Sequence, residues 1–142
     1  MKTVKDILEE KGHQVWSIAP DATVYEALKV MGEREVGALT VVDGGNLVGI
    51  VSERDYARKV ILRGKTSRET RVREIMTAAV VTTSPEQTVE ECMATMTERR
   101  IRHLPVIERG RMVGMVSIGD LVKSIIAEQQ FMIEQLETYI TR

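Results

Sequence analysis

Apolar residues recur with the period of an α-helix in two separate segments of the chain. In each segment they fall at positions i, i+3, i+4 and i+7, so they share one helix face. The two series are Val24, Ala27, Leu28 and Met31, and Val89, Cys92, Met93 and Met96. Thr-x-x-Glu precedes each series, and this pattern lets the Thr hydroxyl and the Glu carboxylate cap the first helical turn reciprocally. The pattern therefore predicts two capped amphipathic helices, which begin behind Thr23 and Thr88.

Short β-rich runs surround both predicted helices. One run precedes each helix, at Val15–Ile18 and at Val80–Thr83. Two more runs joined by turn residues follow each helix: Leu39–Val42 with Leu47–Val51, and Leu104–Ile107 with Met112–Val116. A further helix is expected after Ser52 and after Ser117. Each half of the chain therefore has the predicted order β-α-β-β-α.

The two halves are an internal repeat. A shift of 65 residues aligns Pro20–Ile61 with Pro85–Ile126 without a gap, and 16 of the 42 aligned positions are identical, which indicates duplication. One such unit leaves a sheet face uncovered, and two units can cover each other. We expect an α+β fold of two pseudo-symmetric repeats packed through their sheets. Residues 1–68 would form the first repeat with its lead-in and linker, and residues 69–142 the second with a C-terminal helical extension.

Each repeat closes with the motif Gly-x-Val-Ser-x-x-Asp, at Gly49–Asp55 and Gly114–Asp120. A lead-in of the form Val-x-Asp/Glu-Ile-Leu/Met opens each repeat, at Val4–Leu8 and Val72–Met76. In this order and spacing the motifs resemble the CBS-domain family over nearly the whole chain. The resemblance implies a tandem pair (a Bateman module) similar to stand-alone bacterial two-CBS proteins. It also implies an adenosyl ligand, such as AMP, ADP, ATP, NAD or S-adenosylmethionine, in clefts between the repeats.

The resemblance implies that Asp55 and Asp120 bind ribose hydroxyls and that Ser52 and Ser117 contact ribose or phosphate. Elementary chemistry agrees, because a helix N-terminus attracts anions and a carboxylate can accept two hydrogen bonds from a vicinal diol. A second interpretation stays open, since Ser-x-x-Asp is also a helix-capping pattern.

The adenine is expected between the first strand of a repeat and the strand that carries Gly49 or Gly114. Trp16, Val81 and Thr83 are the candidate residues on the first strands. For Trp16, a place in the apolar core is an equally good interpretation.

The two predicted clefts differ in charge. Arg102 and His103 enter the second repeat where Gly37 and Ala38 enter the first. In related pairs basic residues at these positions contact phosphates, so we expect Arg102 at the cleft of the first motif and His103 at that of the second. Gly37 and Ala38 would leave room for a sugar or base. The alternative is a solvated Arg and a half-buried His bonded to the backbone. An imidazole with its ordinary pKa predicts stronger phosphate binding in mild acid.

Basic residues accumulate between the repeats: Arg54, Arg58, Lys59, Arg63, Lys65, Arg68, Arg71 and Arg73. Arg54, inside the first motif, is the best candidate for a phosphate contact. The others form either a solvated face and linker or a patch for an anionic partner. Nucleic acid is disfavoured, because no aromatic residues are interleaved for base stacking and the net charge is −1.

Composition narrows the class of protein. Cys92 is the single cysteine, and it falls on the buried helix face, where a core thiol is expected. His13 has no partner at metal-ligand spacing, and no catalytic set is recognisable, so neither a metal site nor an enzyme is expected. The lack of a signal-peptide core and of an apolar run of about 20 residues predicts a cytoplasmic protein that does not span a membrane.

The C-terminal segment carries a heptad pattern. Ile126, Ile133 and Ile140 repeat every seven residues, with Val122, Gln129 and Leu136 between them. This seam predicts packing on a second protomer or on a target, and a homodimer is favoured; folding back on its own chain is the alternative. The predicted function is an AMP-, ATP- or NAD-type sensor that transmits ligand occupancy to an unidentified protein. The alternative is a protein-interacting or DNA-interacting adaptor with vestigial clefts.

Overall fold

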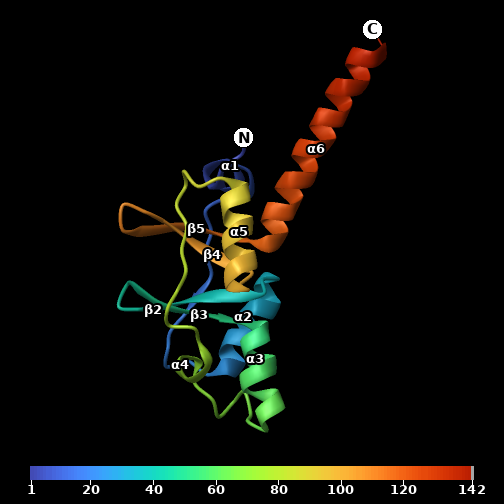
Figure 1. The fold of residues 1–142 in the computed structure, drawn as a ribbon. Coiled ribbons are helices and arrows are strands. Elements are labelled where there is room, and N and C mark those ends of the chain that lie inside the picture. The colour runs from blue at the N-terminus through green and yellow to red at the C-terminus, as the bar shows by residue number, and fades with distance from the viewer. Residues whose placement is uncertain (142) are drawn as a thin grey trace. The chain divides into compact units, whose positions relative to one another are not determined.

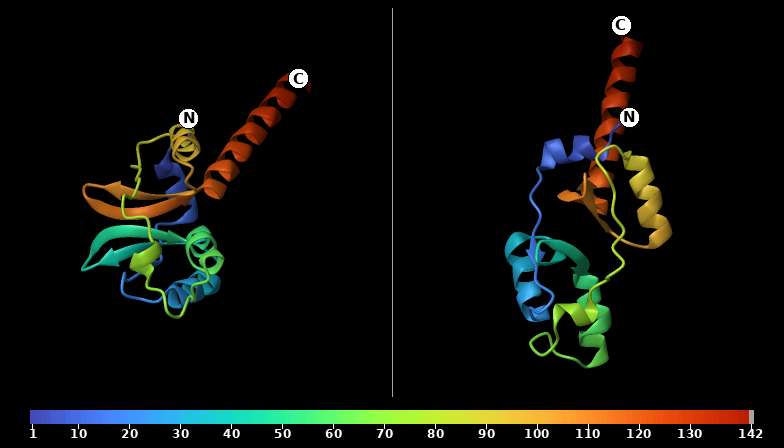
Figure 2. Two further views of the ribbon diagram at one scale, coloured as in Figure 1. Left: turned by 60° about the horizontal axis from the view of Figure 1, so that its bottom comes forward. Right: turned by 90° about the vertical axis from the view of Figure 1, so that its left-hand side faces the viewer.

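The computed structural model describes residues 1–141 and shows a mixed helix-and-strand fold (Figures 1 and 2). In chain order the elements are α1 (Val4–Lys11), β1 (Ser17–Ile18), α2 (Val24–Arg34), β2 (Ala38–Asp43), β3 (Asn46–Ser52), α3 (Glu53–Lys59), the 3-10 helix η1 (Ile61–Arg63), α4 (Val72–Ile75), α5 (Val89–Arg99), β4 (His103–Glu108), β5 (Arg111–Ser117) and α6 (Ile118–Thr141). Two small sheets and a long C-terminal helix confirm the predicted α+β class.

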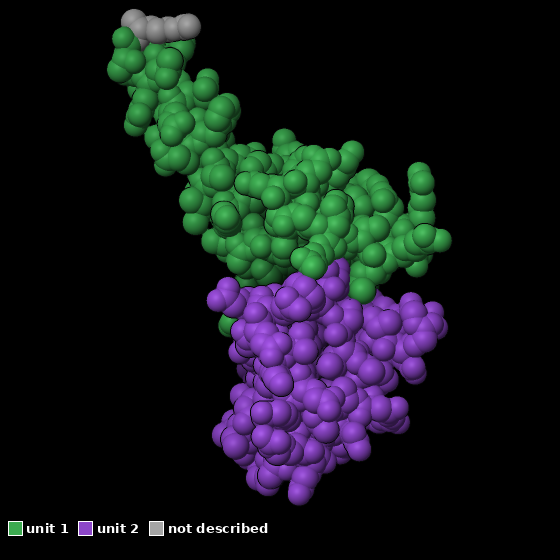
Figure 3. Space-filling view, turned by 180° about the vertical axis from the view of Figure 1, so that it is seen from behind, with its two compact units in different colours: residues 1–14, 82–142 green, residues 15–81 purple. Residues whose placement is uncertain are grey.

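The chain forms two compact units, which Figure 3 shows in two colours. Unit 1 comprises residues 1–14 and 82–142, and unit 2 comprises Val15–Val81. Unit 1 is therefore assembled from both ends of the chain, whereas unit 2 is continuous in sequence.

Unit 2 is built on a three-stranded sheet in the order β1-β2-β3. Strand β1 runs parallel to β2, and β2 runs antiparallel to β3. Helix α2 presents its predicted apolar face to this sheet, because Val24, Ala27 and Met31 are all buried. The other buried members of the core are Leu39, Val41, Val51, Val60, Val72 and Ile75.

Unit 1 repeats this plan with the antiparallel pair β4–β5. Helix α5 buries Val89, Cys92 and Met96, the counterparts of the buried residues of α2. Helix α1 contributes Val4, Ile7 and Leu8 to the same unit. Burial raises the pKa of the Cys92 thiol, as expected for a core cysteine.

The lead-in of each repeat packs with the other repeat. In unit 1 the Val4 N–H donates to the Gln87 carbonyl at 2.9 Å, so α1 is bonded beside the start of α5. In unit 2 the Val72 N–H donates to the Ala22 carbonyl at 2.9 Å, which places α4 beside the start of α2. The compact units therefore differ from a division of the sequence at residue 68, because the two lead-ins are exchanged.

Two glycines allow the lead-ins to pack closely against the sheets. A Cβ atom at Gly114 would lie 2.7 Å from Leu8 Cδ2, and one at Gly49 would lie 2.6 Å from Met76 Sδ. Leu8 belongs to α1, and Met76 directly follows α4. We therefore assign the glycine of each closing motif to packing of the exchanged lead-in.

Both predicted Thr caps are present. The Glu91 N–H donates to Thr88 Oγ1 at 3.1 Å, and the Thr88 N–H donates back to Glu91 Oε1 at 3.2 Å. In α2 the cap consists of the Glu26 N–H donating to Thr23 Oγ1 at 3.1 Å. Both helices thus begin at the residues that the sequence pattern predicts.

The predicted strand at Val80–Thr83 is wrong. Only an isolated bridge between Thr83 and Val106 forms there. In unit 2 the equivalent segment is held by the Thr40 N–H, which donates to the Trp16 carbonyl at 3.2 Å. Pro105 stands in the place of Thr40 and has no N–H to donate, so the second parallel strand loses this hydrogen bond.

Candidate functional site

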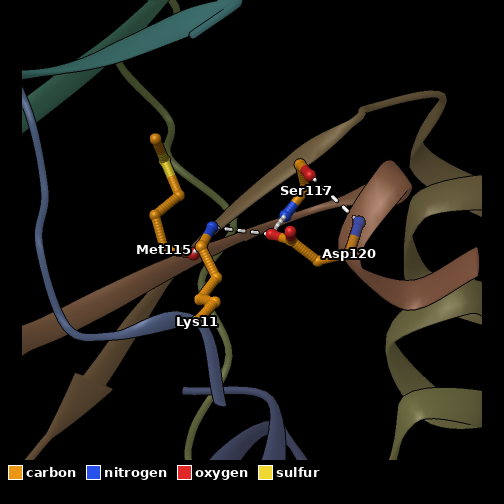
Figure 4. A network of polar contacts seen from close by, with 4 residues as sticks. All are labelled: Lys11, Met115, Ser117 and Asp120. Carbon is orange, nitrogen blue, oxygen red and sulfur yellow. Dashed lines mark hydrogen bonds and ion pairs between the residues drawn. The ribbon is translucent and has the colours of Figure 1, made fainter. Parts of the chain in front are cut away.

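The two Ser-x-x-Asp motifs open helices α3 and α6 with the same hydrogen bonds. The Asp55 N–H donates to Ser52 Oγ at 3.2 Å, and the Ser52 N–H donates back to Asp55 Oδ2 at 2.9 Å. At the second motif the corresponding distances are 3.2 Å from Asp120 N to Ser117 Oγ and 2.8 Å from Ser117 N to Asp120 Oδ2 (Figure 4). Both motifs are therefore helix caps, whatever else they bind.

A lysine from another element contacts the second motif. Lys11 Nζ lies 2.7 Å from Asp120 Oδ2 and donates to the Met115 carbonyl at 2.9 Å (Figure 4). Burial acts to raise the pKa of Asp120, but hydrogen bonds from Lys11 and Ser117 outweigh it, so this pKa lies below its ordinary value. Asp120 is therefore an ionised carboxylate at neutral pH, and an ammonium group stands beside it.

The first motif has a lysine of its own. Lys59 follows Asp55 by one helical turn; its Nζ lies 3.2 Å from Asp55 Oδ1 and donates to the Ile75 carbonyl at 2.9 Å. Because Ser52 also contacts Oδ2, both oxygens of Asp55 are engaged within unit 2. At Asp120 the cap and Lys11 share Oδ2, so neither of them uses Oδ1.

His103 lies beside Ser117, its partner in the β4–β5 ladder. Burial lowers the pKa of its imidazole below 6.5; the charges of Lys11 and Arg102 act in the same direction, and Asp120 opposes them. His103 is therefore neutral at pH 7, and the predicted gain of phosphate affinity on protonation moves to more acidic pH. The side chain of Arg102 is exposed, while its carbonyl accepts the Ile118 N–H at 2.9 Å at the start of α6.

Gly37 and Ala38 occupy the equivalent places in unit 2. The Gly37 carbonyl accepts the Glu53 N–H at 3.0 Å at the start of α3, and Ala38 is buried opposite Ser52 in the β2–β3 ladder. The backbone around the two motifs is thus repeated, while a cationic Arg and a neutral His occur only at the second copy of these positions.

The candidate residues on the first strands make contacts with their own units. Trp16 is half-buried against the core of unit 2, and the Arg34 guanidinium lies 4.1 Å from the centroid of its ring. Thr83 Oγ1 lies 3.4 Å from Cys92 Sγ, so this hydroxyl is directed toward α5. Val81 is half-buried at the end of unit 2. A role of these residues in adenine binding stays a prediction.

Several residues of the basic segment are used within unit 2. Arg71 Nη1 donates to the Asp21 carbonyl at 2.8 Å, and Arg73 forms an ion pair with the Asp21 carboxylate. The guanidinium of Arg68 lies 3.9 Å from the centroid of the Tyr25 ring. Arg54 is half-exposed on the first turn of α3, next to Asp55.

A groove in unit 1 lies apart from the predicted site residues. It has a volume of about 490 Å³, and it is lined by Thr3, Lys5, Leu8, Glu9, His13, Pro85, Glu86, Glu108 and Val113. None of these residues belongs to either closing motif. His13 Nδ1 lies 2.8 Å from the Val113 carbonyl, which gives this histidine a backbone partner.

Sequence reasoning missed Lys11 as a neighbour of the second motif and did not single out Lys59 for the first. The spacing of Asp55 and Lys59 by four residues signals a contact on one helix. No local signal links Lys11 to Asp120, which are 109 residues apart and meet because α1 belongs to unit 1.

Residues 1–141 contain no group of three or more His, Cys, Asp or Glu side chains arranged to hold a metal ion. Among the helices of the same residues, none combines the length and apolar character needed to cross a membrane.

Comparison with known proteins identifies relatives of most of the chain. The family model described as "CBS domain" matches residues 4–62 and 72–127. A solved structure of a signal-transduction protein with CBS domains from Burkholderia ambifaria is 53% identical, with a TM-score of 0.88 over 90% of this chain and 96% of that one. The mitochondrial CBS domain-containing protein CBSX3 of Arabidopsis thaliana is 43% identical over 97% of this chain and 71% of its own length.

One solved relative contains bound ligands. The CBS domain pair of protein MJ0100 was crystallised in complex with 5′-methylthioadenosine and S-adenosyl-L-methionine. It is 27% identical to this chain, with a TM-score of 0.78 over 90% of this chain and 98% of that one.

Proposed function

The chain belongs to the CBS-domain family, and on that premise we propose that it is a regulatory protein that binds an adenosyl ligand of the AMP, ADP, ATP or NAD type. The observation that carries the proposal is the pair of partly exposed carboxylates at the starts of α3 and α6, each beside a lysine ammonium. The adenosyl ligands of the MJ0100 domain pair and the signal-transduction name of the Burkholderia relative support it.

The chemistry of binding follows from these groups. Asp120 Oδ1, which neither the cap nor Lys11 uses, can accept hydrogen bonds from a ribose diol. The ammonium group of Lys11 stands beside the second motif and is the cation for a phosphate there. The guanidinium of Arg102 is the second cation of unit 1, and we keep the expectation that it contacts a phosphate at the cleft of the first motif. The start of α6 adds a partial positive charge, although its Ile118 and Asp120 N–H groups already donate to the Arg102 carbonyl and to Ser117 Oγ. We assign the strongest ligand affinity to the second motif, because both oxygens of Asp55 are already engaged.

The ligand acts by shifting a conformational equilibrium. As part of the proposal, the ligand binds at the second motif and contacts Asp120 and Lys11 there. A ligand that binds one arrangement of the repeats more tightly than another increases the population of that arrangement. The change passes to a protein partner that is not yet identified. Homodimerisation, a cytoplasmic location and the absence of catalysis belong to the same proposal; the mitochondrial name of the plant relative makes cell fractionation a direct test of the location.

The basic segment supports a second candidate function, an adaptor for protein or DNA whose clefts are vestigial. Arg58, Arg63 and Lys65 are exposed between the repeats. Of the eight basic residues of the segment, four make the contacts described above with Asp21, Tyr25, Asp55 or the Ile75 carbonyl. The other four are these three exposed residues and Arg54. A salt-dependent shift of duplex DNA by the wild type, with no effect of any adenosyl ligand, would favour this function over the first.

A thermal-shift panel of AMP, ADP, ATP, NAD, adenosine and S-adenosylmethionine tests the main proposal. We expect at least one ligand to raise the melting temperature of the wild type, and Asp120→Ala to abolish more of this rise than Asp55→Ala. Asp6→Ala is the matched control, because Asp6 forms the same type of capping box with Thr3 at the start of α1 but lies outside both motifs. No response to any of these compounds, or equal losses in all three variants, would contradict the proposal.

A further inference from the structure

The C-terminal half of α6 extends away from the rest of unit 1 (Figures 1 and 3). Helix α6 has 24 residues, which corresponds to a length of about 36 Å. Leu121 and Ser124 in its first turns are buried against the unit, whereas every residue from Gln129 to Thr141 is exposed. Only the beginning of the helix therefore finds packing partners within unit 1.

The exposed part of α6 carries an apolar stripe. All six seam residues are exposed: Val122, Ile126, Gln129, Ile133, Leu136 and Ile140. At about 100° per residue, Ile126, Ile133 and Ile140 fall within about 40° of one another on the helix surface. Ile140 is 77% and Leu136 60% exposed, so the stripe runs to the end of the described helix. A stripe of this length costs free energy in water unless another apolar surface covers it.

The charges along α6 select one orientation for a partner helix of the same sequence. Beyond Gln129 the charged residues of the described helix are Glu134 and Glu137, and Lys123 lies nearer the body of unit 1. A parallel pair would set the acidic ends side by side. An antiparallel pair sets Glu137 of each helix beside Lys123 of the other, and it also opposes the two helix dipoles favourably.

We propose that α6 pairs antiparallel with α6 of a second copy of this chain. In the register that uses the whole seam, Val122 packs against Ile140 of the second copy. Ile126 packs against Leu136, and Gln129 packs against Ile133. The inference specifies the homodimer named under the proposed function, and it does not depend on ligand binding.

Substitution on two faces of the same helix tests the interface. Sedimentation equilibrium of the full chain is expected to show a dimer for the wild type and a monomer for Ile133→Glu, with a dissociation constant raised at least about 100-fold. Phe131→Glu is the matched control: Phe131 is 60% exposed on α6 but lies on the opposite face from the seam. A monomeric wild type, or equal dissociation of the two variants, overturns the proposal.

Charge reversal tests the orientation. Lys123→Glu and Glu137→Lys, each alone, are expected to weaken the dimer about tenfold, because each places like charges together at two symmetric sites. The double variant is expected to restore wild-type affinity, and failure to restore it overturns the antiparallel arrangement. The thermal-shift panel repeated on Ile133→Glu keeps the two proposals separate: a ligand response of the monomer leaves the ligand proposal intact, whatever the sedimentation result.

Discussion

Each unit places a lysine ammonium group beside its motif carboxylate, but the lysine comes from a different element in the two units. In unit 2 the ammonium group beside the motif carboxylate comes from Lys59, on the same helix as Asp55. Ser124 stands at the equivalent position of α6, where it is buried and its hydroxyl has no hydrogen-bond partner among the described residues. Unit 1 instead receives its ammonium group from Lys11 at the end of α1. Duplication thus preserved the backbone and the charge beside the carboxylate, while the element that supplies the charge changed.

The difference affects what each motif can bind. Lys59 occupies the second oxygen of Asp55, whereas Lys11 shares the oxygen that the cap already uses. Unit 1 also carries Arg102 and His103 where unit 2 carries Gly37 and Ala38. The comparison therefore predicts unequal sites, with the anionic part of a ligand favouring unit 1.

The largest expected effect on stability is at Gly114 and Gly49, where the sheet backbone lies close to Leu8 and Met76. Gly114→Ala should lower the free energy of unfolding by about 2 kcal/mol and Gly49→Ala by about 1 kcal/mol, because overpacking costs most where the neighbour cannot move. Leu8 is 1% exposed and confined, whereas the atom nearest to a Cβ at Gly49 belongs to the flexible Met76 side chain, and the Thr77 carbonyl at 3.1 Å needs to shift only slightly. Urea unfolding of both variants measures the difference. Gly32→Ala, with no atom within 4 Å of its Cβ and a helical position, should stabilise the protein instead; a larger loss at Gly49 than at Gly114 would contradict the explanation.

The next effect concerns the charge of the second site. The double variant Arg102→Gly/His103→Ala introduces at these two positions of unit 1 the residues that unit 2 carries. It should reduce the affinity for AMP about tenfold relative to that for adenosine. Titration calorimetry with both compounds measures the ratio. Equal losses for AMP and adenosine would show that these residues do not contact a phosphate.

A smaller effect on stability distinguishes Lys11 from Lys59. Lys11→Met should destabilise the protein by about 1 kcal/mol at pH 7, because it leaves a half-buried carboxylate without its cation and releases the end of α1. Lys59→Met should cost about 0.5 kcal/mol, since its ion pair is longer, at 3.2 Å against 2.7 Å, and joins neighbouring turns of one helix.

The loss of stability expected for Lys11→Met depends on pH. The lowered pKa of Asp120 contributes stability above the unfolded value of 3.8, and this contribution disappears as pH falls through the lower folded value. The gap between the wild type and Lys11→Met should therefore close in acid when unfolding is followed from pH 7 to pH 2. A gap that stays constant over this range would exclude the contact with Asp120 as its cause.

The smallest effect has the opposite sign. Ser124→Ala should stabilise the protein by about 0.5 kcal/mol, because it removes a buried hydroxyl without a partner and improves helix propensity. Thermal unfolding measures the change. A loss of stability would mean that the Ser124 hydroxyl has a hydrogen-bond partner, such as a bound water.

Local patterns predicted local structure well. The Thr-x-x-Glu and Ser-x-x-Asp signals placed four helix starts, because the residues that cap a helix are its neighbours in sequence. Contacts over long separations were not predictable in this way. The pairing of α1 with α5, and with it the approach of Lys11 to Asp120, follows from the exchanged lead-ins, which no local pattern records. The failed strand at Val80–Thr83 had a visible signal in Pro105, which removes a donor from the neighbouring strand.

The exchange of lead-ins has a consequence for synthesis on the ribosome. Unit 2 is continuous from Val15 to Val81, so all of its strands and helices have been made before α5 exists. Residues 1–14 must wait, with the apolar face of Val4, Ile7 and Leu8 uncovered, until the last part of the chain emerges. Domains that are complete early fold early. All of unit 2 is therefore synthesised before unit 1 is complete. Helix α1 is made first but can pack into its unit only after α5 has been made.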